Sequence, residues 1–286
     1  MNDQPQSVYF ISDAHLGSGP DHDMRVRTLV ALLRSFRHDA ESVYVLGDLF
    51  DFWFEYRHAI PRGHFKVLRA LAELVEAGVP VTYLGGNHDF WSGSYLSREV
   101  GLEVHQHPIT RQHQGRRLFL AHGDGLGPGD IGYRILKAIL RHPLAVALYR
   151  TIHPDLGIPL AYRVSKTSRQ HTAGREVLLD RMARYVVTPR IRAGDDTVIV
   201  GHIHDPIHLT GPGRSEFVIV GDWLEHFTYV RLTGGTLHLQ RFRESADRDG
   251  TFTTERIAPE PWPTGLAPHA EPGQGLRAAA TCPREP

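Results

Sequence analysis

Five short motifs place side chains that can bind metal ions directly after apolar runs of the chain. In order they are ISDAHLG, VLGDLFD, LGGNHDF, LAHGD and VGHIH. In the first and last motifs the two candidate ligands are two residues apart, so on an extended segment both point to the same side. The candidate ligands are Asp13, His15, Asp48, Asn87, His122, His202 and His204. Seven ligands are too many for one tetrahedral ion and favour two ions that share Asp48.

The types of ligand narrow the metal and the chemistry. Oxygen and nitrogen donors without thiolate favour manganese, iron or zinc over calcium or copper, and of these we expect Mn²⁺. The only cysteine, Cys282, cannot build a thiolate site or a disulfide framework. Two ions about 3.5–4 Å apart can clamp an in-line displacement at phosphorus and lower the pKa of a water. The ligand set therefore predicts a dimetal hydrolase of phosphoesters or pyrophosphates.

Each motif follows an expected strand, which gives the ligands a common place in a fold. β-Branched and aromatic runs predict strands, and apolar residues at helical spacing predict helices between them. The strands are expected at 7–12, 42–47, 80–85, 116–123 and 196–202, and the helices at 22–37 and 64–78. This alternation predicts an α/β domain, in which ligand sites lie outside the carboxyl ends of the strands. Runs at 216–221, 227–233 and 236–242 predict an antiparallel meander.

Charge is unevenly distributed along a chain whose net charge is zero. Residues 131–192 hold 12 Lys or Arg and 3 acids, a charge of +9, so the remainder carries −9. Such a segment suggests an anionic partner, whether phosphate, nucleic acid or a membrane surface. Its periodicity predicts one amphipathic helix over 131–150 and two more over 157–170 and 174–187. The apolar side of the first comprises Ile135, Leu136, Ile139, Leu140, Val146 and Leu148.

Two interpretations of the helix at 131–150 stay open. The helix can lie in a membrane interface, where anionic lipid attracts its cations. Alternatively, its apolar side packs against the core and its cations are solvated. In either case the segment directly follows His122 and can form a lid over the ions. A lid that is apolar inside and basic at its edge could hold acyl chains together with a diphosphate.

The apolar runs and the two ends of the chain allow expectations about where the protein is located and which part of it is ordered. No run of 18 apolar residues predicts a spanning helix. The start MNDQPQSVYF is unlike a secretory signal, so we expect a cytoplasmic address. Residues 244–286 are polar and rich in Pro and Gly, and we expect them to be a tail that is disordered towards its end. Nothing in the sequence predicts an oligomeric state.

The ordered set DxH, GD, GNHD, H and GHxH resembles the calcineurin-like metallophosphoesterase superfamily over about residues 7–240. The resemblance implies a four-layer αββα sandwich, with a core of residues 7–128 and 193–243 and a helical insertion at 129–192. It implies one ion held by Asp13, His15, Asp48 and His204, and a second held by Asp48, Asn87, His122 and His202. It also implies that His88, held by Asp89, contacts the phosphate or the leaving group.

Longer stretches, YVLGDLFDFWFEY, GNHDFWSG and HGDGLGPGDIGY, resemble the UDP-2,3-diacylglucosamine diphosphatase family. That resemblance implies attack at the α-phosphate to give UMP and 2,3-diacylglucosamine 1-phosphate, a step of lipid A biosynthesis, at the cytoplasmic face of the inner membrane. The substrate contacts that it implies are Asn87, His88, Asp130, Ser168, Thr172, Arg175, His202 and Trp53. The best-known members carry Arg in place of His88, and Asn and Lys in place of Thr172 and Arg175.

Two other functions are weighed against this one. A phosphodiesterase or nuclease with another phosphoester substrate would use the basic segment to track a polyanion, with steep salt dependence. The segment is rich in Leu and Ile and has no aromatic-interleaved basic groove, so no nucleic acid is expected. A non-catalytic scaffold would have lost ligands, and here none of the seven is missing.

Overall fold

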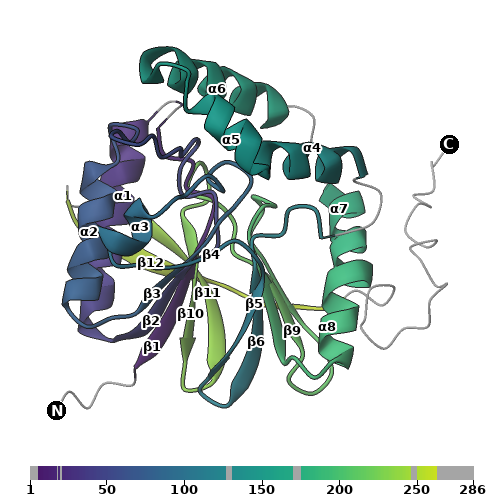
Figure 1. Cartoon of the computed structure of the whole chain (residues 1–286). Helices are drawn as coiled ribbons and strands as arrows, with labels where there is room; N and C mark the ends of the chain where they lie inside the picture. The colour runs from purple at the N-terminus through teal and green to yellow at the C-terminus, as the bar shows by residue number, and fades with distance from the viewer. Residues whose placement is uncertain are drawn as a thin grey trace, which may run out of the picture.

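The structure, a computed structural model, describes residues 6–17, 19, 21–126, 131–169, 175–245 and 250–262. Two β-sheets lie face to face, with helices on the outer side of each (Figure 1). The larger sheet has the strand order β12-β11-β10-β1-β2-β3-β4 and the smaller one β13-β8-β9-β7-β6-β5. The described part of the chain therefore has the four layers of helix, sheet, sheet and helix that the resemblance to the metallophosphoesterase superfamily implies.

The strands of the larger sheet are β1 (Ser7–Ile11), β2 (Ala40–Val45), β3 (Val81–Leu84), β4 (Glu103–His105), β10 (Thr228–Thr233), β11 (Thr236–Glu244) and β12 (Phe252–Ile257). Those of the smaller sheet are β5 (Ile109–His113), β6 (Arg116–Ala121), β7 (Thr197–Val200), β8 (Ile207–Thr210), β9 (Glu216–Ile219) and β13 (Glu260–Pro261). Strands β1 to β4 run parallel, as do β6, β7 and β9. Parallel strands point their carboxyl ends to one edge, which is where both sheets place their loops with candidate ligands.

Alternating side chains of the central strands form separate apolar layers. In β1, Val8 and Phe10 face the smaller sheet and pack with Leu120 and Ile199. The intervening Tyr9 and Ile11 face outward into the layer beneath the helices. Because successive side chains of a strand point to opposite faces, a strand covered on both sides is apolar throughout. The strands that carry the first two ligand motifs are therefore fixed on both faces.

Helices cover the outer faces of the two sheets. Helices α1 (His22–Ser35), α2 (Phe65–Glu76) and α3 (Tyr95–Arg98) lie over the larger sheet, and α7 (Arg175–Met182) and α8 (Thr188–Arg192) over the smaller one (Figure 1). A 3-10 turn, Phe36–His38, follows α1, and a π-helical stretch, Ala183–Val187, joins α7 to α8. Helices α4 (Ile131–Arg141), α5 (Pro143–Tyr149) and α6 (Pro154–Arg169) form a separate group above the carboxyl ends of the strands.

The single helix predicted over 131–150 is wrong. The chain breaks at His142, whose ψ of 133° is extended, and α5 begins at Pro143. The proline ring disfavours helical backbone in the residue before it, so α4 has to end there. The His142 side chain then caps α5 by accepting a hydrogen bond from Leu144 N, at 3.2 Å.

The meander predicted for the last three strands is also wrong. Strand β9 belongs to the smaller sheet, where it pairs with β7 and β8, while β10 and β11 form a hairpin in the larger one. Strand periodicity and turn residues indicate where strands begin and end, but not which sheet each strand joins. The segment between β9 and β10 consequently crosses from one sheet to the other.

Two strands lie within the segment that we expected to be a polar tail. Strand β12 extends the larger sheet, where Phe252 stacks on Phe242 with ring centres 5.0 Å apart. Strand β13 pairs with β8, and the buried Trp262 beside it packs on Phe217. Both are edge strands with exposed polar residues, so their pattern lacks the apolar signal of a central strand. Residues 263–286, the end of the expected tail, lie outside the described part of the chain.

Candidate metal centre

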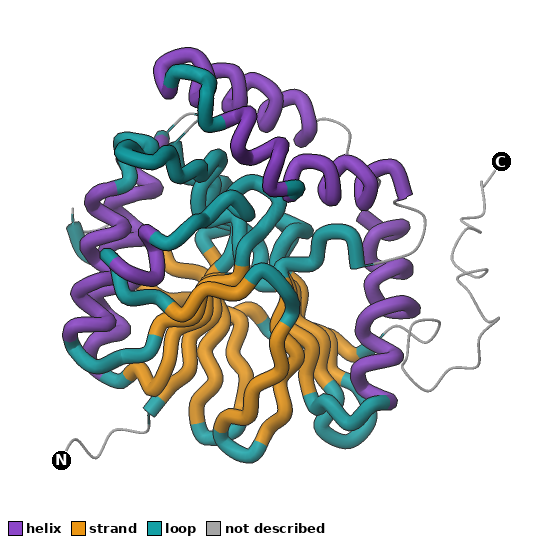
Figure 2. Tube along the Cα trace, in the orientation of Figure 1, coloured by secondary structure: helices purple, strands orange, loops and turns teal. Residues whose placement is uncertain are grey.

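Loops from both sheets meet at one end of the sandwich. Asp13 and His15 follow β1, Asp48 follows β2, and Asn87 follows β3, all in the larger sheet. His122 follows β6, and His202 and His204 follow β7, in the smaller sheet. In Figure 2 these loops gather between the strand ends and helices α4 to α6. The seven predicted ligands therefore come from two sheets to one region.

A first group of donors forms around His15. Its Nε2 lies 3.2 Å from Nε2 of His204, 3.7 Å from Oδ1 of Asp13 and 3.8 Å from Oδ2 of Asp48. The same Oδ1 of Asp13 lies 3.6 Å from Nε2 of His204. One donor atom each from Asp13, His15 and His204 lies within 4.8 Å of the others. These are the ligands expected for the first ion.

A second group of donors forms around His122. Its Nε2 lies 3.3 Å from Oδ2 of Asp48 and 3.0 Å from Oδ1 of Asn87. The rings of His122 and His202 are edge to face, with centres 5.2 Å apart. Oδ2 of Asp48 is thus within 4 Å of a nitrogen in each group. The geometry agrees with an Asp48 carboxylate shared by two ions.

One buried oxygen indicates that these donors fit cations. Oδ1 of Asp13 is buried and has no hydrogen-bond partner among the described residues. Its other oxygen accepts from Ser12 Oγ at 2.5 Å and from His202 N at 2.8 Å. A buried carboxylate oxygen that faces two imidazole nitrogens beyond hydrogen-bond range needs a partner, and a divalent cation between them would satisfy all three. The side chains present are therefore suited to the ions that the sequence predicts.

The backbone at four of the ligands is left-handed. Asp13, His15, Asp48 and His202 have φ angles of 53°, 43°, 50° and 66°. Non-glycine residues seldom adopt such angles, and they persist where the surrounding structure holds them. Here the hydrogen bonds from Asp13 N to Gly47 O and from His15 N to Asp48 O continue the pairing of β1 with β2 beyond the strands. Paired loops thus fix the direction of these side chains.

Two glycines let the loops approach the carboxylates. A Cβ on Gly86 would lie 2.1 Å from Oδ1 of Asp48, and one on Gly201 would lie 2.5 Å from Oδ2 of Asp13. The same Asp48 oxygen accepts a hydrogen bond from His88 N at 2.8 Å. The glycines of the GGNHD and GHIH motifs therefore leave room for the carboxylates.

Opposite charges keep Asp48 in the form that binds cations. Burial alone would raise its pKa, but His122 and His88 beside it hold the pKa well below the usual range. Burial likewise opposes a charge on His122, yet Asp48 raises the pKa of that imidazole well above its usual value. Burial and the neighbouring His122 lower the pKa of His202 to about 4, which keeps its ring neutral as a ligand must be.

His88 lies at the edge of the two groups, and its surroundings differ from those expected. Its Nε2 is 3.9 Å from Oδ2 of Asp48, while its Nδ1 is 3.1 Å from the backbone oxygen of Asp51 and 3.7 Å from Oδ1 of that residue. Asp51 also lies 3.6 Å from Nδ1 of His15. The sequence missed Asp51, although it is the second aspartate of LGDLFD. This residue holds His88 in the way expected of Asp89.

The expectation that Asp89 holds His88 is wrong. The Asp89 carboxylate accepts hydrogen bonds from Gly86 N at 2.8 Å, Asp48 N at 3.2 Å and Phe50 N at 3.3 Å. The Tyr83 hydroxyl donates a further bond to it. With both oxygens occupied by these donors, Asp89 ties the loop after β3 to the loop after β2. Its contribution to the site is the shape of the two loops.

A second carboxylate that the sequence analysis missed orients His204. Oδ2 of Asp222 lies 3.4 Å from Nδ1 of His204, and Oδ1 accepts hydrogen bonds from the backbone nitrogens of Glu225 and His226. A carboxylate on the far nitrogen of a ligating histidine sets its tautomer and ring orientation. The sequence contains a signal for this residue, because Asp222 follows β9 as part of a Gly-Asp pair, just as Asp48 follows β2.

The predicted substrate contacts are placed only in part. Asn87, His88 and His202 lie in the centre, as described above. Asp130 and Thr172 lie outside the described residues, and the side chains of Ser168 in α6 and Arg175 in α7 are likewise not described. Trp53 does not fit its expected role: it has no exposed surface, stacks on Phe50 and donates to Glu55 Oε1. An indole packed this way supports the loop after β2 from within the core.

Helix α4 lies over the centre, with Lys137 and Arg141 facing inward. The ammonium of Lys137 pairs with Asp124, two residues after His122, and the Arg141 guanidinium lies 4.9 Å above the Phe90 ring. Ile135 and Ile139, by contrast, are 55% and 57% exposed. At these positions the interpretation that the apolar side packs on the core is wrong, because α4 presents it outward.

Exposed apolar side chains continue along the insertion. We call Ile135, Ile139, Leu144, Leu148, Leu156 and Leu160 the outer face; each is more than half exposed. They belong to α4, α5 and α6, the helices above the strand ends in Figure 1. None of the helices in the described ranges is both long and apolar enough to cross a membrane. The outer face therefore lies along surface helices.

Aromatic contacts attach the insertion to the core. Trp91, in the loop after the GNHD motif, donates from Nε1 to Leu140 O at 2.8 Å. Tyr149 of α5 packs against Phe54 and Trp91, with ring centres 4.6 and 5.2 Å away. Arg150 Nε lies 3.3 Å from Glu55 O. The insertion is thus held by the same loops that carry the ligands.

Comparison with known proteins agrees with this geometry. The family described as calcineurin-like phosphoesterase matches residues 7–206. A UDP-2,3-diacylglucosamine hydrolase of Porphyromonas gingivalis is 36% identical over 256 residues, which cover 83% of this chain and 98% of that protein. One of Stenotrophomonas maltophilia is 32% identical over 246 residues, covering 80% and 96%.

Solved structures are more distant. Vacuolar Protein Sorting 29 of Cryptosporidium parvum covers 89% of this chain and 98% of its own, with a TM-score of 0.44 and 14% identity. A dimetal phosphatase of Danio rerio covers 82% and 96%, with a TM-score of 0.42 and 15% identity. These values are too low for either structure to add to the assignment.

Proposed function

We propose that this chain, which belongs to the calcineurin-like phosphoesterase family and is therefore a metal-dependent hydrolase, cleaves UDP-2,3-diacylglucosamine. The products are UMP and 2,3-diacylglucosamine 1-phosphate, as in lipid A biosynthesis. One observation carries the proposal: the donors of five loops converge on Asp48 beneath an insertion whose outer face is apolar. A lipid-linked diphosphate needs both parts.

The two ions are proposed to be held by the two groups of donors. Asp13, His15 and His204 surround the first position; Asn87, His122 and His202 surround the second; Asp48 lies between them. When bound, two divalent ions neutralise phosphoryl oxygens and lower the pKa of a water. Oxygen and imidazole donors without thiolate favour Mn²⁺, with iron and zinc as alternatives. Asp51 and Asp222 orient His15 and His204 from behind.

His88 is proposed to contact the phosphate. Its Nδ1 lies 3.1 Å from the backbone oxygen of Asp51, and its Nε2 is on the side of the donors, 3.9 Å from Oδ2 of Asp48. A hydrogen bond donated from Nε2 would reach a phosphoryl oxygen of a bound diphosphate. Such a donor stabilises the charge that develops on the phosphoryl oxygens. Water adds to the α-phosphorus, the bond from that phosphorus to the bridging oxygen breaks, and the sugar phosphate leaves.

The enzyme is proposed to work at a membrane surface, at the cytoplasmic face of the inner membrane. The outer face would enter the interface, because its six aliphatic side chains are directed away from the core. A polyanion such as nucleic acid fits the insertion less well. Several cations of the basic segment are already paired: Lys137 with Asp124, Arg184 with Asp180 and Arg190 with Asp195.

The experiment is hydrolysis of UDP-2,3-diacylglucosamine by the Mn²⁺-loaded protein in water enriched in ¹⁸O. We expect UMP to form and to carry the label, since attack is at the α-phosphorus. Label in the sugar phosphate would mean attack at the other phosphorus and contradict the mechanism. Cleavage of an aryl phosphodiester without any UMP would discard the substrate and retain the reaction class. The chelated protein is the control and should release no UMP.

A further inference from the structure

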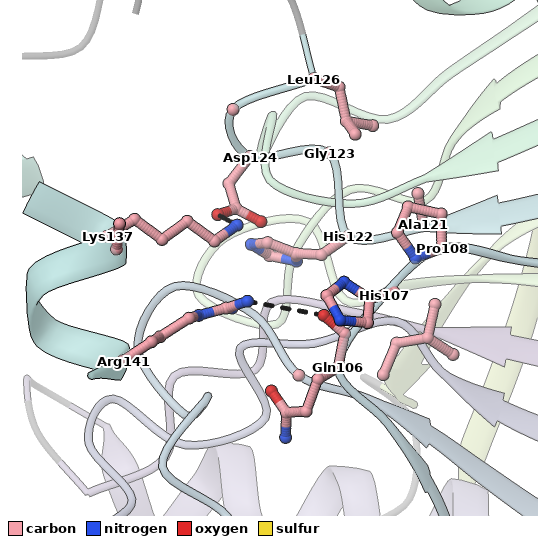
Figure 3. Close-up of a pocket in the computed structure, with 14 residues that line it drawn as sticks. Gln106, His107, Pro108, Ala121, His122, Gly123, Asp124, Leu126, Lys137 and Arg141 are labelled. Atoms are coloured by element: carbon pink, nitrogen blue, oxygen red, sulfur yellow. Dashed lines mark hydrogen bonds and ion pairs between the residues drawn. The ribbon is translucent and has the colours of Figure 1, made fainter. Parts of the chain in front are cut away.

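Two cations of helix α4 extend towards the loops that carry the second group of donors (Figure 3). Lys137 forms an ion pair with Asp124, in the loop after β6. One helical turn later, the Arg141 guanidinium lies 3.5 Å from the backbone oxygen of Gly86, the residue directly before Asn87. Residues four apart in a helix lie on the same face. A single face of α4 therefore contacts one ligand loop from each of the two sheets.

Arg141 contacts the loop after β3 on both sides of its ligand motif. Its guanidinium lies 4.9 Å above the Phe90 ring, and two of its nitrogens lie 3.5 Å from the backbone oxygens of Gly86 and Gln106. A planar guanidinium can stack on a ring and donate sideways to carbonyl oxygens at the same time, which the ammonium of lysine cannot. Arg141 thus bridges the two ends of the segment 87–89, which presents a metal ligand and a histidine of the site.

A further contact of α4 holds the same loop beyond its ligand motif. Trp91 donates from Nε1 to the backbone oxygen of Leu140, at 2.8 Å. From the other side, the Asp89 carboxylate accepts a hydrogen bond from Asp48 N at 3.2 Å, which ties the loop after β3 to the loop after β2. The loop is therefore held by the core on one side and by α4 on the other, and the position of Asn87 depends on both.

The loop of the first group is held by an arginine of the core. Arg25 of α1 is 2% exposed and donates to the backbone oxygens of Ala14 and His15, at 3.1 and 3.3 Å. Each group of donors thus has an arginine on the carbonyl oxygens of one of its loops. The arginine of the first group belongs to the core, whereas Arg141 belongs to the insertion. Loss of Arg141 should therefore affect one ion more than the other.

We propose that Arg141 is a positioning residue for the second ion, and that it acts by fixing Asn87 relative to His122. Oδ1 of Asn87 lies 3.0 Å from Nε2 of His122. An amide oxygen carries no net charge, so its contribution to cation binding depends on precise placement. Groups that orient the ligands of a metal are commonly worth about 10- to 100-fold in affinity. The inference rests on the two-ion centre of the proposed function, and it gives the insertion a part in metal binding.

The test measures the two Mn²⁺ binding steps separately. The chelated full chain is titrated with Mn²⁺ by calorimetry, and electron paramagnetic resonance distinguishes a coupled pair of ions from single ions. Arg141→Met should weaken one step about tenfold and leave the other within about twofold of the wild type. At a free Mn²⁺ concentration a few times the wild-type dissociation constant of that step, the wild type should show the coupled pair and the variant mainly single ions.

A double-mutant cycle tests whether Arg141 acts through Asn87. Asn87→Ala removes the donor itself and should weaken the same step. If Arg141 acts by placing that donor, Arg141→Met should cost little further affinity in the Asn87→Ala background. The direction of the change separates position from charge. A guanidinium repels a nearby divalent ion, so loss of its charge alone would tighten binding.

Two further variants guard against a general loss of structure. Arg184→Met is the matched control: this arginine of the same basic segment pairs with Asp180, four residues before it, at 2.8 Å, and the variant should bind both ions like the wild type. Trp91→Phe keeps the ring and removes the N–H that donates to α4, so it should weaken the same step severalfold. If circular dichroism shows that Arg141→Met does not fold, Trp91→Phe decides, and wild-type affinity for both ions would overturn the inference.

The outcomes also separate this inference from the proposed function. In a folded Arg141→Met variant, unchanged or tighter binding of both ions, equal weakening of both steps, or a full additional loss in the Asn87→Ala background would overturn the inference alone. A wild type that binds fewer than two Mn²⁺ ions would overturn the two-ion centre and the inference with it. No measurement here uses UDP-2,3-diacylglucosamine, so failure of that substrate would leave the role of Arg141 standing.

Discussion

The loops that hold the metal ligands and the helical insertion above them differ in where they direct their side chains. The ligand loops bury their charged groups, and Asp13, His15 and Asp48 are each no more than 1% exposed. In helices α4 to α6, Lys137 and Arg141 face the core, whereas six large aliphatic side chains are directed outward. The ligand loops continue the hydrogen bonding of two sheets, whereas α4 and α5 of the insertion contact the loops beneath them through aromatic and polar side chains.

The difference separates two requirements of the reaction. Metal ligands must be fixed to within fractions of an ångström, and loops that continue a sheet with both faces covered provide that. A surface that receives lipid must remain apolar and accessible, which is compatible with helices attached at a few points. Substitutions in the two regions should therefore fail in different ways, and the following experiments are ordered from the largest expected effect to the smallest.

Replacement of His122 by Ala should cause the largest loss. The side chain contacts Asp48 and Asn87 at 3.3 and 3.0 Å, so its removal should eliminate one bound ion and lower kcat by about 10³-fold or more. Metal analysis of the purified variant together with UMP release checks this. His58→Ala, at an exposed position before α2, is the control. A variant that retains two equivalents of metal and full turnover would refute the ligand assignment.

Replacement of His88 by Ala should separate metal binding from rate. His88 lies at the edge of the centre, 3.9 Å from Asp48, so the variant should retain its metal and lose about 10²-fold in kcat. KM should change little if the contact is made in the transition state. Steady-state kinetics and metal content are measured on the same preparation. An unchanged rate would remove His88 from the mechanism.

The outer face should affect membrane binding without affecting the chemistry. Leu144 and Leu148 are 61% and 60% exposed, and changing both to Ser removes apolar area worth about 2 kcal/mol in an interface. Sedimentation with vesicles containing anionic lipid should show about 30-fold weaker binding. Hydrolysis of a soluble aryl phosphodiester should match the wild type. Equal vesicle binding by both proteins would mean that the outer face does not contact lipid.

The smallest effect is expected where the two regions meet. At Gly17, in the loop after β1, Tyr162 of α6 and His64 of the core come close together. A Cβ at this position would lie 2.5 Å from the Tyr162 hydroxyl and 3.1 Å from the ring of His64. Burial, with a smaller contribution from His22, lowers the pKa of His64 to about 4. Between pH 6.5 and about pH 4, His64 is protonated in the unfolded chain but neutral in the folded one. The free energy of unfolding therefore falls as the pH is lowered through this range.

His64→Phe removes that dependence. Between pH 7 and pH 5.5 the free energy of unfolding of the wild type should fall by about 1 kcal/mol more than that of the variant. Urea unfolding at the two pH values measures the difference, and His38→Phe, at an exposed turn, is the matched control. The same pH dependence in His64→Phe and wild type would mean that the ring is not kept neutral in the fold.

The ligands could be predicted from the sequence because each follows a strand, and the strands could be predicted from their apolar runs. Asp48 and His122 could be identified as ligands without knowing which side chains lie beside them. Asp222 was missed because its role depends on β9 lying in the smaller sheet, and strand pairing between distant segments is not written in local periodicity. Asp51 was missed because a loop after a strand gives no indication of which of its carboxylates faces inward.

The insertion shows a different limit. Periodicity identifies an apolar side of a helix but not the environment that this side faces. For α4 the usual assumption fails, because Asp124 and the Phe90 ring attract Lys137 and Arg141 towards the core. The break at His142 was predictable, since Pro143 is visible in the sequence. Strand β12 was not, because an edge strand with polar residues such as Thr253, Thr254 and Glu255 resembles a linker.

Gly86 and Gly201 bear on how the enzyme can change by mutation. Neither has a positive φ, so other residues could adopt their backbone angles. A Cβ on Gly86 would instead collide with Oδ1 of Asp48, and one on Gly201 would collide with Ser12 Oγ and with Oδ2 of Asp13. In a saturation library even alanine at these two positions should displace an aspartate and score as poorly as loss of the aspartate itself. Tolerance maps would then mark as essential two residues that have no side chain to take part in the reaction.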